Sequence, residues 1–387
     1  MTIQLVNDAK SKKAFHQLPF KIYKDDPNWI PHLKQDIEAV FDPKKNKFFR
    51  QGEAVRYLLK KEGKPIGRIA AFINHKANKK SRSAIGGIGF FECIEDEKAA
   101  FELFNAAKEW LESREMKVME GPINFGEKDK FWGLIIENFQ EPPYYNQNYN
   151  PEYYVSFFEN YGFKIYYEQY IYHRSTTADL KQLLIDKSHR IHRDKNYHFE
   201  TIKKNNLEKY AEDFRTIYNR GWSESYDGFI KMEKAQAMAI MKTIKPVIDE
   251  DLILFAYYKD QPAGFFIALP EINQIFKHVN GNLNWWGKLK FLYHKWKGTC
   301  DKFFGLAFGI DPDFQARGLE GALMEECKNI VGKKNQYKEL VITWIGDFNP
   351  KMIHVIENLG AKKLRTMATY RYLFDRKAKF ERAKKVK

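Results

Sequence analysis

Residues 304–326 (FGLAFGIDPDFQARGLEGALMEE) combine an apolar run, a glycine-containing loop and a stretch of helical character. The apolar run at 303–310 is typical of a buried strand, and 319–331 is expected to be a helix. A loop that leads from a strand into a helix presents main-chain N–H groups at the positive end of the helix dipole, where a phosphate or pyrophosphate is favoured. Gly318 and Gly321 would let that backbone approach a ligand closely. We predict an anion site here, with a tight strand-to-helix turn as the alternative.

Three carboxylates and a tyrosine are the candidate acid–base groups. Glu224 and Asp227 lie in a loop after a helix expected to begin at Leu207, and Asp347 ends a strand. Each could remove a proton from a nucleophile, and a role as a loop or N-cap residue is the alternative for each. Tyr370, in the last strand, is the candidate acid. The ten histidines show no partnership with a nucleophile, and we expect no metal site.

The elements around these residues recur along the chain. Residues 57–73 and 254–270 both predict a strand, a charged turn with Pro-x-Gly, and a second strand. Residues 150–164 and 349–363 both open a helix with Asn-Pro and close it with Glu-Asn-x-Gly. Both features recur at nearly the same offset, roughly 200 residues, which indicates an internal duplication. Each unit is expected to contain helices, an antiparallel strand pair, a strand–helix–strand segment, a short helix and a closing strand pair.

Length and composition fit two folded domains. The chain has 387 residues, of which 44% are hydrophobic and 30% charged, a globular balance in a chain longer than one core usually needs. We expect a first domain at 1–176, a basic connector at 177–195, a second domain at 196–376 with an insertion at 272–302, and a basic tail at 377–387. The expected class is α/β of the α+β type, with a mixed, mostly antiparallel sheet flanked by helices in each domain.

The net charge of +15 favours phosphate-rich partners such as nucleic acid, coenzyme A or an anionic bilayer, although lysine-rich surfaces also serve solubility. The basic segments match no nucleic-acid-binding motif, so nucleic acid other than tRNA is not an expected partner. Three scattered cysteines favour a reducing compartment. With neither an apolar leader nor an apolar run of about 18 residues, the expected location is the cytoplasm.

The order strand, Gln-x-x-Gly loop, helix, strand and Asn-Pro helix, over roughly residues 200–375, resembles the GNAT superfamily of N-acetyltransferases. The Q-x-x-G-x-G/A motif of that superfamily binds the CoA pyrophosphate through main-chain amides. The resemblance implies acetyl-CoA or another acyl-CoA as co-substrate, direct transfer of the acyl group to an amine, and no metal. The residues implied to bind CoA are Phe308, Gly309, Ile310, Gln315, Ala316, Arg317, Gly318, Leu319, Glu320, Gly321 and Asn349.

Two departures from the family pattern bear on activity. Glu320 places a carboxylate where the family has Gly or Ala. This carboxylate would repel a pyrophosphate unless the side chain turns outward and Gly321 takes the role of the family's small residue. Arg317 would offset the negative charge of Glu320. The tyrosine that often protonates the leaving thiolate is replaced by Ile356 in the second unit and by Phe158 in the first.

The first unit is expected to be a degenerate, non-catalytic copy. Its equivalent of the phosphate loop lies at 86–104 and lacks the motif. Acidic residues suit an empty helix N-terminus and oppose a bound pyrophosphate. The residues that crowd this helix start are Glu92, Glu95, Asp96 and Glu97.

Segments 218–229, 269–274 and 343–352 are similar to a group of bacterial GNAT-like proteins of unassigned activity. This likeness supports the fold only. The function implied by the resemblance to the GNAT superfamily is an acyl-CoA-dependent N-acyltransferase acting on an unidentified amine, either a small molecule or a peptide. Two alternatives stay open. One is a binding protein that kept the fold and lost the site. The other is an aminoacyl-tRNA-dependent transferase, which the chain's resemblance to tandem-GNAT transferases that take amino acids from charged tRNA implies and which would use the basic surface.

The insertion mixes aromatic residues with lysines. Such a mixture suits a water–lipid interface, and thus peripheral membrane contact, or a lid over an aromatic pocket. Packing of the aromatic residues against the first unit is the alternative. The residues concerned are Trp285, Trp286, Phe291, Tyr293 and Trp296 with Lys288, Lys290, Lys295 and Lys297.

Overall fold

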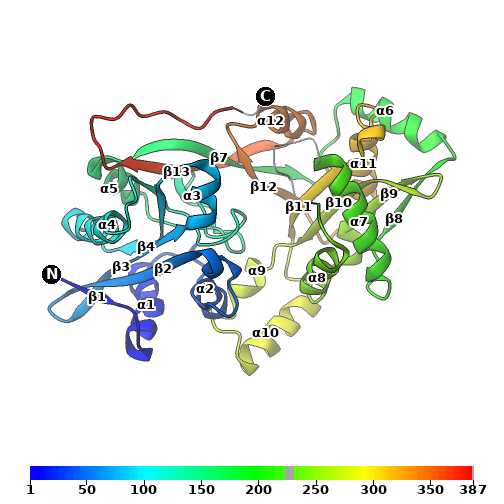
Figure 1. Cartoon of the computed structure of the whole chain (residues 1–387). Helices are drawn as coiled ribbons and strands as arrows, with labels where there is room; N and C mark the ends of the chain where they lie inside the picture. Colours follow the sequence, from blue (N-terminus) through cyan, green and yellow to red (C-terminus); the bar gives the residue numbers. More distant parts are fainter. Residues whose placement is uncertain (223–230, 386–387) are drawn as a thin grey trace.

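A computed structural model describes residues 1–222 and 231–385, which fold around one 13-stranded sheet (Figure 1). The strands are β1 (Thr2–Leu5), β2 (Gly52–Lys61), β3 (Lys64–Asn74), β4 (Ile85–Cys93), β5 (Val118–Gly121), β6 (Leu134–Glu137), β7 (Lys164–Ser175), β8 (Tyr197–Thr201), β9 (Ile253–Tyr258), β10 (Gln261–Pro270), β11 (Lys302–Ile310), β12 (Glu339–Gly346) and β13 (Lys362–Leu373). They lie in the order β1-β2-β3-β4-β5-β13-β7-β12-β11-β10-β9-β8, and β6 pairs with β13. Among the strand pairs of the described residues, only β4–β5 and β11–β12 are parallel, so the expected mixed, mostly antiparallel α/β architecture is confirmed.

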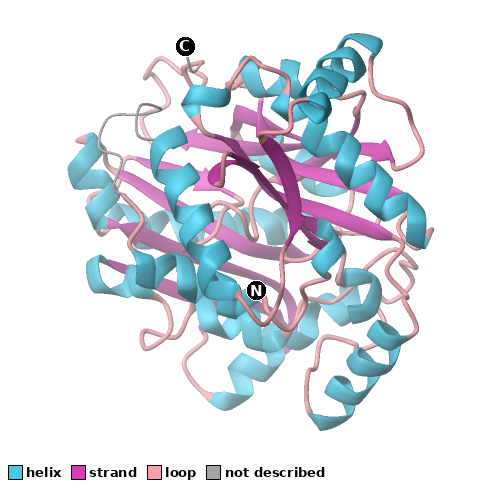
Figure 2. Cartoon of the chain, turned by 90° about the vertical axis from the view of Figure 1, so that its right-hand side faces the viewer, coloured by secondary structure: helices cyan, strands magenta, loops and turns pink. Residues whose placement is uncertain are grey.

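Helices pack around the strands (Figure 2). The helices are α1 (Ala9–Ile22), α2 (Lys34–Val40), α3 (His75–Ser81), α4 (Glu97–Glu112), α5 (Tyr153–Tyr161), α6 (Gln182–Arg193), α7 (Leu207–Trp222), α8 (Lys234–Ile244), α9 (Asn273–Phe276), α10 (Trp285–Trp296), α11 (Leu319–Lys334) and α12 (Pro350–Asn358). Alternate residues of β10 join different cores: Phe266 packs with α6 and α11, whereas Phe265 packs with α7 and α8. This period of two places one core on each face of the sheet.

The two halves repeat one order of elements. The β2–β3 hairpin, β4, α4, β5, α5 and β7 of the first half correspond to the β9–β10 hairpin, β11, α11, β12, α12 and β13 of the second. Gly162 after α5 and Gly360 after α12 both adopt a positive φ, at +105° and +80°, where only glycine is unstrained. The helix expected from Leu207 also forms, because its apolar positions recur every three to four residues and bury one face.

The closing strands are exchanged between the halves. β13, from the end of the chain, pairs with β5, β6 and β7, all of the first half. β7, from the first half, pairs with β13 and with β12 of the second half. The prediction of a closing strand pair within each unit is therefore wrong. Two edges that would otherwise be open are covered by strands from the opposite half, which joins both halves in one sheet.

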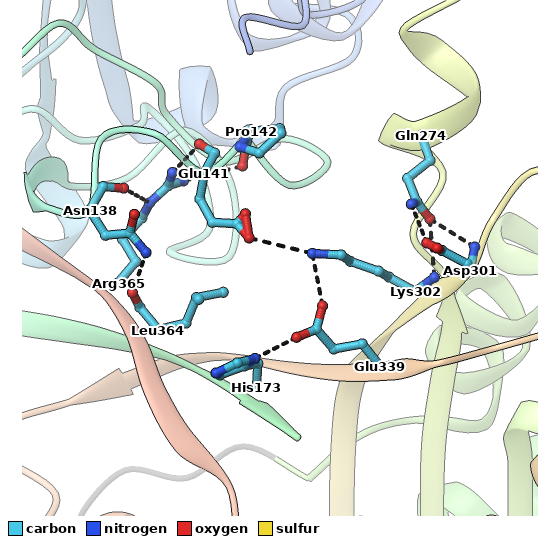
Figure 3. A network of polar contacts seen from close by, with 10 residues as sticks. All are labelled: Asn138, Glu141, Pro142, His173, Gln274, Asp301, Lys302, Glu339, Leu364 and Arg365. Carbon is cyan, nitrogen blue, oxygen red and sulfur yellow. Dashed lines mark hydrogen bonds and ion pairs between the residues drawn. The ribbon is translucent and has the colours of Figure 1, made fainter. Parts of the chain in front are cut away.

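A charged network fixes the junction of the halves (Figure 3). Lys302, at the start of β11, pairs with Glu339 of β12 at 2.8 Å and with Glu141 of the first half at 3.5 Å. His173 of β7 also contacts Glu339. The buried Arg365 of β13 donates to main-chain carbonyl groups of the loop that carries Glu141. Lys302 and Arg365, both from the second half, thus hold the loop around Glu141 of the first half in place.

Glu271, which follows β10, gives this junction a pH dependence. Burial raises the pKa of its carboxyl to about 7; one carboxylate oxygen accepts from the N–H groups of Tyr145 and Asn273, and the other has no partner. The folded state therefore binds more protons than the unfolded state between about pH 4.5 and 7, so the free energy of unfolding falls as pH rises through that range.

Glu271→Gln should remove this dependence. We expect the free energy of unfolding of this variant, minus that of the natural protein, to increase by up to about 3 kcal/mol from pH 5 to pH 8. Denaturant unfolding of both proteins at the two pH values measures this difference. Glu102→Gln on the exposed face of α4 is the control and should show no such trend. A Glu271→Gln variant whose relative stability is independent of pH would contradict the assignment.

The insertion joins β10 to β11, which pair antiparallel. Phe276 and Val279 of the insertion pack with Ile30 and Leu33 of the first half. Of the aromatic residues for which packing against the first unit was the alternative, Phe291 packs against this cluster. The tryptophans of α10 are instead exposed. No helix among residues 1–222 and 231–385 is both long and apolar enough to cross a bilayer.

Candidate functional site

The sheet opens between β11 and β12. The parallel pairing of these strands runs from Lys302 with Glu339 only as far as Gly305 with Ile342. Beyond that point β11 stays paired with β10 up to Ile310 but has no partner on its β12 side. Leu306, in the interior of the sheet order, is consequently 48% exposed. The two strands diverge in a V whose mouth lies at the carboxyl ends of both.

Irregularities in both strands produce this divergence. On β11, Leu306 is an extra residue, because Ile267 pairs with Ala307 and Ala268 with Gly305. On β12, the pairing with β7 shifts register after Ile342, and Trp344 there has a φ of +66°, which is uncommon for a bulky residue. Bulges bend strands and recur beside active sites. Here they turn β11 and β12 apart and leave main-chain N–H and C=O groups of β11 unpaired along the opening.

The predicted loop lies at the mouth of the V. A 3-10 turn at Pro312–Phe314 follows β11, residues 315–317 are exposed, and α11 begins at Leu319. Ala316 and Gly318 adopt φ values of +60° and +99° on either side of Arg317. A backbone that alternates between left-handed and right-handed conformations directs successive N–H groups to the same side. These groups then form a concave anion-binding site.

The N-terminus of α11 is uncapped. Gly318 is the N-cap residue and has no side chain to accept from the first turn, whose N–H groups have no intrahelical acceptor. Glu320 points from that turn as a half-exposed side chain, with no hydrogen bond or ion pair to any described residue. The carboxylate does not cap the helix, and the unpaired N–H groups and the helix dipole favour an anion.

The packing of α6 against α11 is a second reason for glycine at positions 318 and 321. A Cβ on Gly318 would lie 2.5 Å from Cβ of Lys187, and one on Gly321 would lie 3.1 Å from the carbonyl oxygen of Leu184. The glycines therefore permit close packing of α6 on α11, whether or not they approach a ligand. The same packing brings the cationic Lys187 beside the loop, a residue that the sequence analysis did not select. No local pattern marks it, because its position depends on tertiary packing.

Ion pairs hold the strand end below the loop. Nε of Arg220, near the end of α7, lies 3.0 Å from the buried carboxylate of Asp311, and its Nη2 lies 2.6 Å from Asp313. The amide of Gln315 donates to the carbonyl oxygen of Ile310 at 3.1 Å. The loop thus has a fixed base and an exposed tip.

Of the other predicted residues, Asp347 and Asn349 follow the carboxyl end of β12, across the opening from the loop. Asp347, after β12, is paired with Arg382 of the basic tail at 2.5 Å. Asn349 caps α12 by accepting from the N–H of Met352 at 3.2 Å, and Ile356 is buried on that helix. Glu224 and Asp227 lie outside the described residues.

Tyr370 belongs to the core of the first half. It is fully buried on β13 between β5 and β7, and its hydroxyl donates to Glu159 at 3.1 Å. Burial, together with the Glu159 carboxylate, raises its pKa. Two strands, β7 and β12, separate β13 from β11, so the structure does not bring this tyrosine to the loop.

The equivalent position of the first half is closed. The side chain of Asp96 caps α4 by accepting from the N–H of Ala99 at 3.1 Å, which satisfies one of the donors left free in α11. Phe90, Phe131 and Trp132 fill the space beside β4 as part of one buried cluster. Of the two parallel strand pairs, only β11–β12 combines an exposed strand edge with an uncapped helix.

Within the ranges described, no cluster of three or more His, Cys, Asp or Glu side chains is arranged to hold a metal ion.

Comparison with known proteins finds relatives over most of the chain. No family model matches the sequence. A bacterial ceramide synthase from Caulobacter vibrioides is 27% identical over 367 residues, which cover 92% of this chain and 94% of that protein. Protein YghO from Escherichia coli is 25% identical over 373 residues, with 92% of both chains covered.

Solved structures match the architecture. A tandem GNAT protein from the clavulanic acid biosynthesis pathway aligns with a TM-score of 0.58 at 10% identity, over 97% of this chain and 100% of that one. A GCN5-related N-acetyltransferase from Sphaerobacter thermophilus aligns with a TM-score of 0.50 at 9% identity, over 96% of both chains. Identity this low establishes the fold alone. The duplicated order of elements and these matches together identify the chain as a protein with the tandem GNAT fold.

Proposed function

We propose that this protein is an acyl-CoA-dependent N-acyltransferase and that its acceptor is the amino group of a long-chain amino alcohol. The acceptor class follows from the relative named bacterial ceramide synthase, which is similar over 92% of the chain. A ceramide is the amide of a fatty acid with such an amino alcohol, so its synthesis is an N-acylation.

The open V between β11 and β12 is the observation that carries the proposal. The exposed loop at 315–317 and the uncapped start of α11 offer main-chain donors for the CoA pyrophosphate, and Lys187 and Arg317 supply positive charge beside them. The unpaired edge of β11 leads from this loop into the opening. An extended pantetheine chain could pair with that edge, as an added strand pairs with an open sheet edge.

The chemistry of transfer needs few groups. The amine attacks the thioester carbonyl carbon, the new C–N bond forms as the C–S bond breaks, and the nitrogen loses a proton to a base. In this proposal, main-chain N–H groups near the bulge at Leu306 stabilise the developing oxyanion. Because Ile356 occupies the usual tyrosine position, the thiolate would leave without protonation by that tyrosine. A thiol with a pKa of about 8.5 is acidic enough to leave as the thiolate at neutral pH.

The purified full chain, incubated with palmitoyl-CoA and sphinganine, should release free CoA and form the N-acyl product, detected with a thiol reagent and by mass spectrometry. Acetyl-CoA in place of palmitoyl-CoA tests the acyl length. Binding of acyl-CoA is measured separately by calorimetry. Absence of CoA binding at millimolar concentration would support a non-catalytic binding protein, the alternative that the missing tyrosine favours. Transfer from charged tRNA but not from acyl-CoA would support the aminoacyl-tRNA-dependent alternative.

A further inference from the structure

Helix α10 is attached to the protein by one face only. Gly287 lies so close to the preceding turn that a Cβ there would be 2.2 Å from the carbonyl oxygen of Asn282. The ring of Phe291 packs against Phe276 of α9 at 5.5 Å between centroids. Asn284 caps the helix by accepting from the N–H of Gly287 at 2.9 Å. The helix is therefore fixed in orientation, and it lies at the lower edge of the molecule in Figure 1, away from the sheet.

The opposite face of α10 is apolar and exposed. Its side chains follow the spacing i, i+4, i+7, i+8 and i+11, with one further member at i+1, and they are 41% to 84% exposed. A surface helix normally turns its polar face outward, and α10 does the reverse. Nearly half of the large hydrophobic side chains that are exposed among the described residues lie on this one helix. The members of this face are Trp285, Trp286, Leu289, Leu292, Tyr293 and Trp296.

Positive charge surrounds the apolar face. Residues 272–300 contain lysine at 277, 288, 290, 295 and 297, and no aspartate or glutamate. Lys290 also lines a groove of about 630 Å³ between α10 and the first half, together with Lys21 and Lys34. A surface of this composition is complementary to anionic groups on the partner that covers the tryptophans.

We propose that α10 is an interfacial helix through which the protein binds anionic phospholipid bilayers. Tryptophan and tyrosine favour the boundary between acyl chains and headgroups, where an apolar ring and a polar N–H or O–H are both satisfied. The leucines enter the acyl region beside them. The lysines at the flanks contact the phosphate groups of anionic lipids. The helix lies in the plane of the interface and does not span the bilayer.

Vesicle flotation tests this directly and is independent of any enzymatic activity. The full chain should bind vesicles of phosphatidylcholine with phosphatidylglycerol, and should bind pure phosphatidylcholine vesicles at least tenfold more weakly. The triple variant Trp285→Ser, Leu292→Ser, Trp296→Ser should lose at least tenfold in partition coefficient. The triple variant Lys288→Glu, Lys290→Glu, Lys297→Glu keeps the apolar face and should lose the preference for phosphatidylglycerol.

The matched control is the double variant Ile94→Ser, Ile240→Ser, which removes exposed apolar side chains elsewhere on the surface and should bind like the natural protein. Unfolding curves establish that each variant is folded. Equal binding by the α10 variants and the control would overturn the proposal. So would sedimentation showing that the natural protein self-associates through this face, is monomeric in the serine variant, and binds no vesicles.

Discussion

Residues 1–176, expressed without the rest of the chain, should fail to form a stable fold, and residues 177–387 should fail in the same way. In the first fragment β7 would lose both of its neighbours, because β13 and β12 belong to the second half. In the second fragment β13 would lose every strand with which it pairs. Met367, Ala368 and Tyr370 of β13 would also leave cavities in the cores of the first half, and single large-to-small changes at such positions cost about 2–5 kcal/mol.

Co-expression provides the control for this experiment. Both fragments together, with an affinity tag on one, should give a 1:1 complex whose circular dichroism and cooperative unfolding match those of the intact chain. Each fragment alone should aggregate or unfold without a cooperative transition. A soluble first fragment with a sharp unfolding transition would show that the exchanged strand is dispensable.

Opposite charge changes at the loop should shift CoA affinity in opposite directions. Arg317→Glu should weaken CoA binding at least tenfold, because a carboxylate would replace a cation beside a pyrophosphate. Glu320→Ala should strengthen binding about fivefold, because it removes a negative charge from the first helical turn. Both side chains are at least partly exposed and Glu320 has no described partner. The guanidinium of Arg317 lies 5.6 Å from the ring centroid of Phe314, so unfolding curves check that the Arg317→Glu variant is folded.

Calorimetric titration with CoA at two salt concentrations measures this pair, since the difference between the variants should shrink as salt increases. Lys333→Glu, at the far end of α11, is the matched charge control and should change affinity less than twofold. Equal affinity of the Arg317→Glu and Glu320→Ala variants would place CoA elsewhere and remove the basis of the proposed transfer reaction. Replacing Gly318 is a poor test, because a side chain there would meet Lys187 of α6 and disturb packing directly.

Much of the local structure could be predicted from the sequence. The helix predicted by the Asn-Pro start and the Glu-Asn-x-Gly end within 349–363 forms as α12, and the strand expected at 303–310 forms as β11, which begins one residue earlier, at Lys302. Helix α11 begins at Leu319 as expected, but continues three residues past Val331. Such elements are set by neighbours along the chain: periodic apolar residues, Asn-Pro starts and glycine ends.

The sequence by itself therefore determined the duplicated order of elements, the strand–loop–helix candidate site and the absence of its motif from the first half. Tertiary structure alone decided that β7 and β13 are exchanged, that Tyr370 is a core residue, that α6 lies against Gly318, and that the aromatic face of α10 points outward. The physical reason is the range of the interactions. Periodicity and caps act over a few residues, whereas strand partners and buried faces depend on segments that are distant in sequence and meet only when the chain has folded.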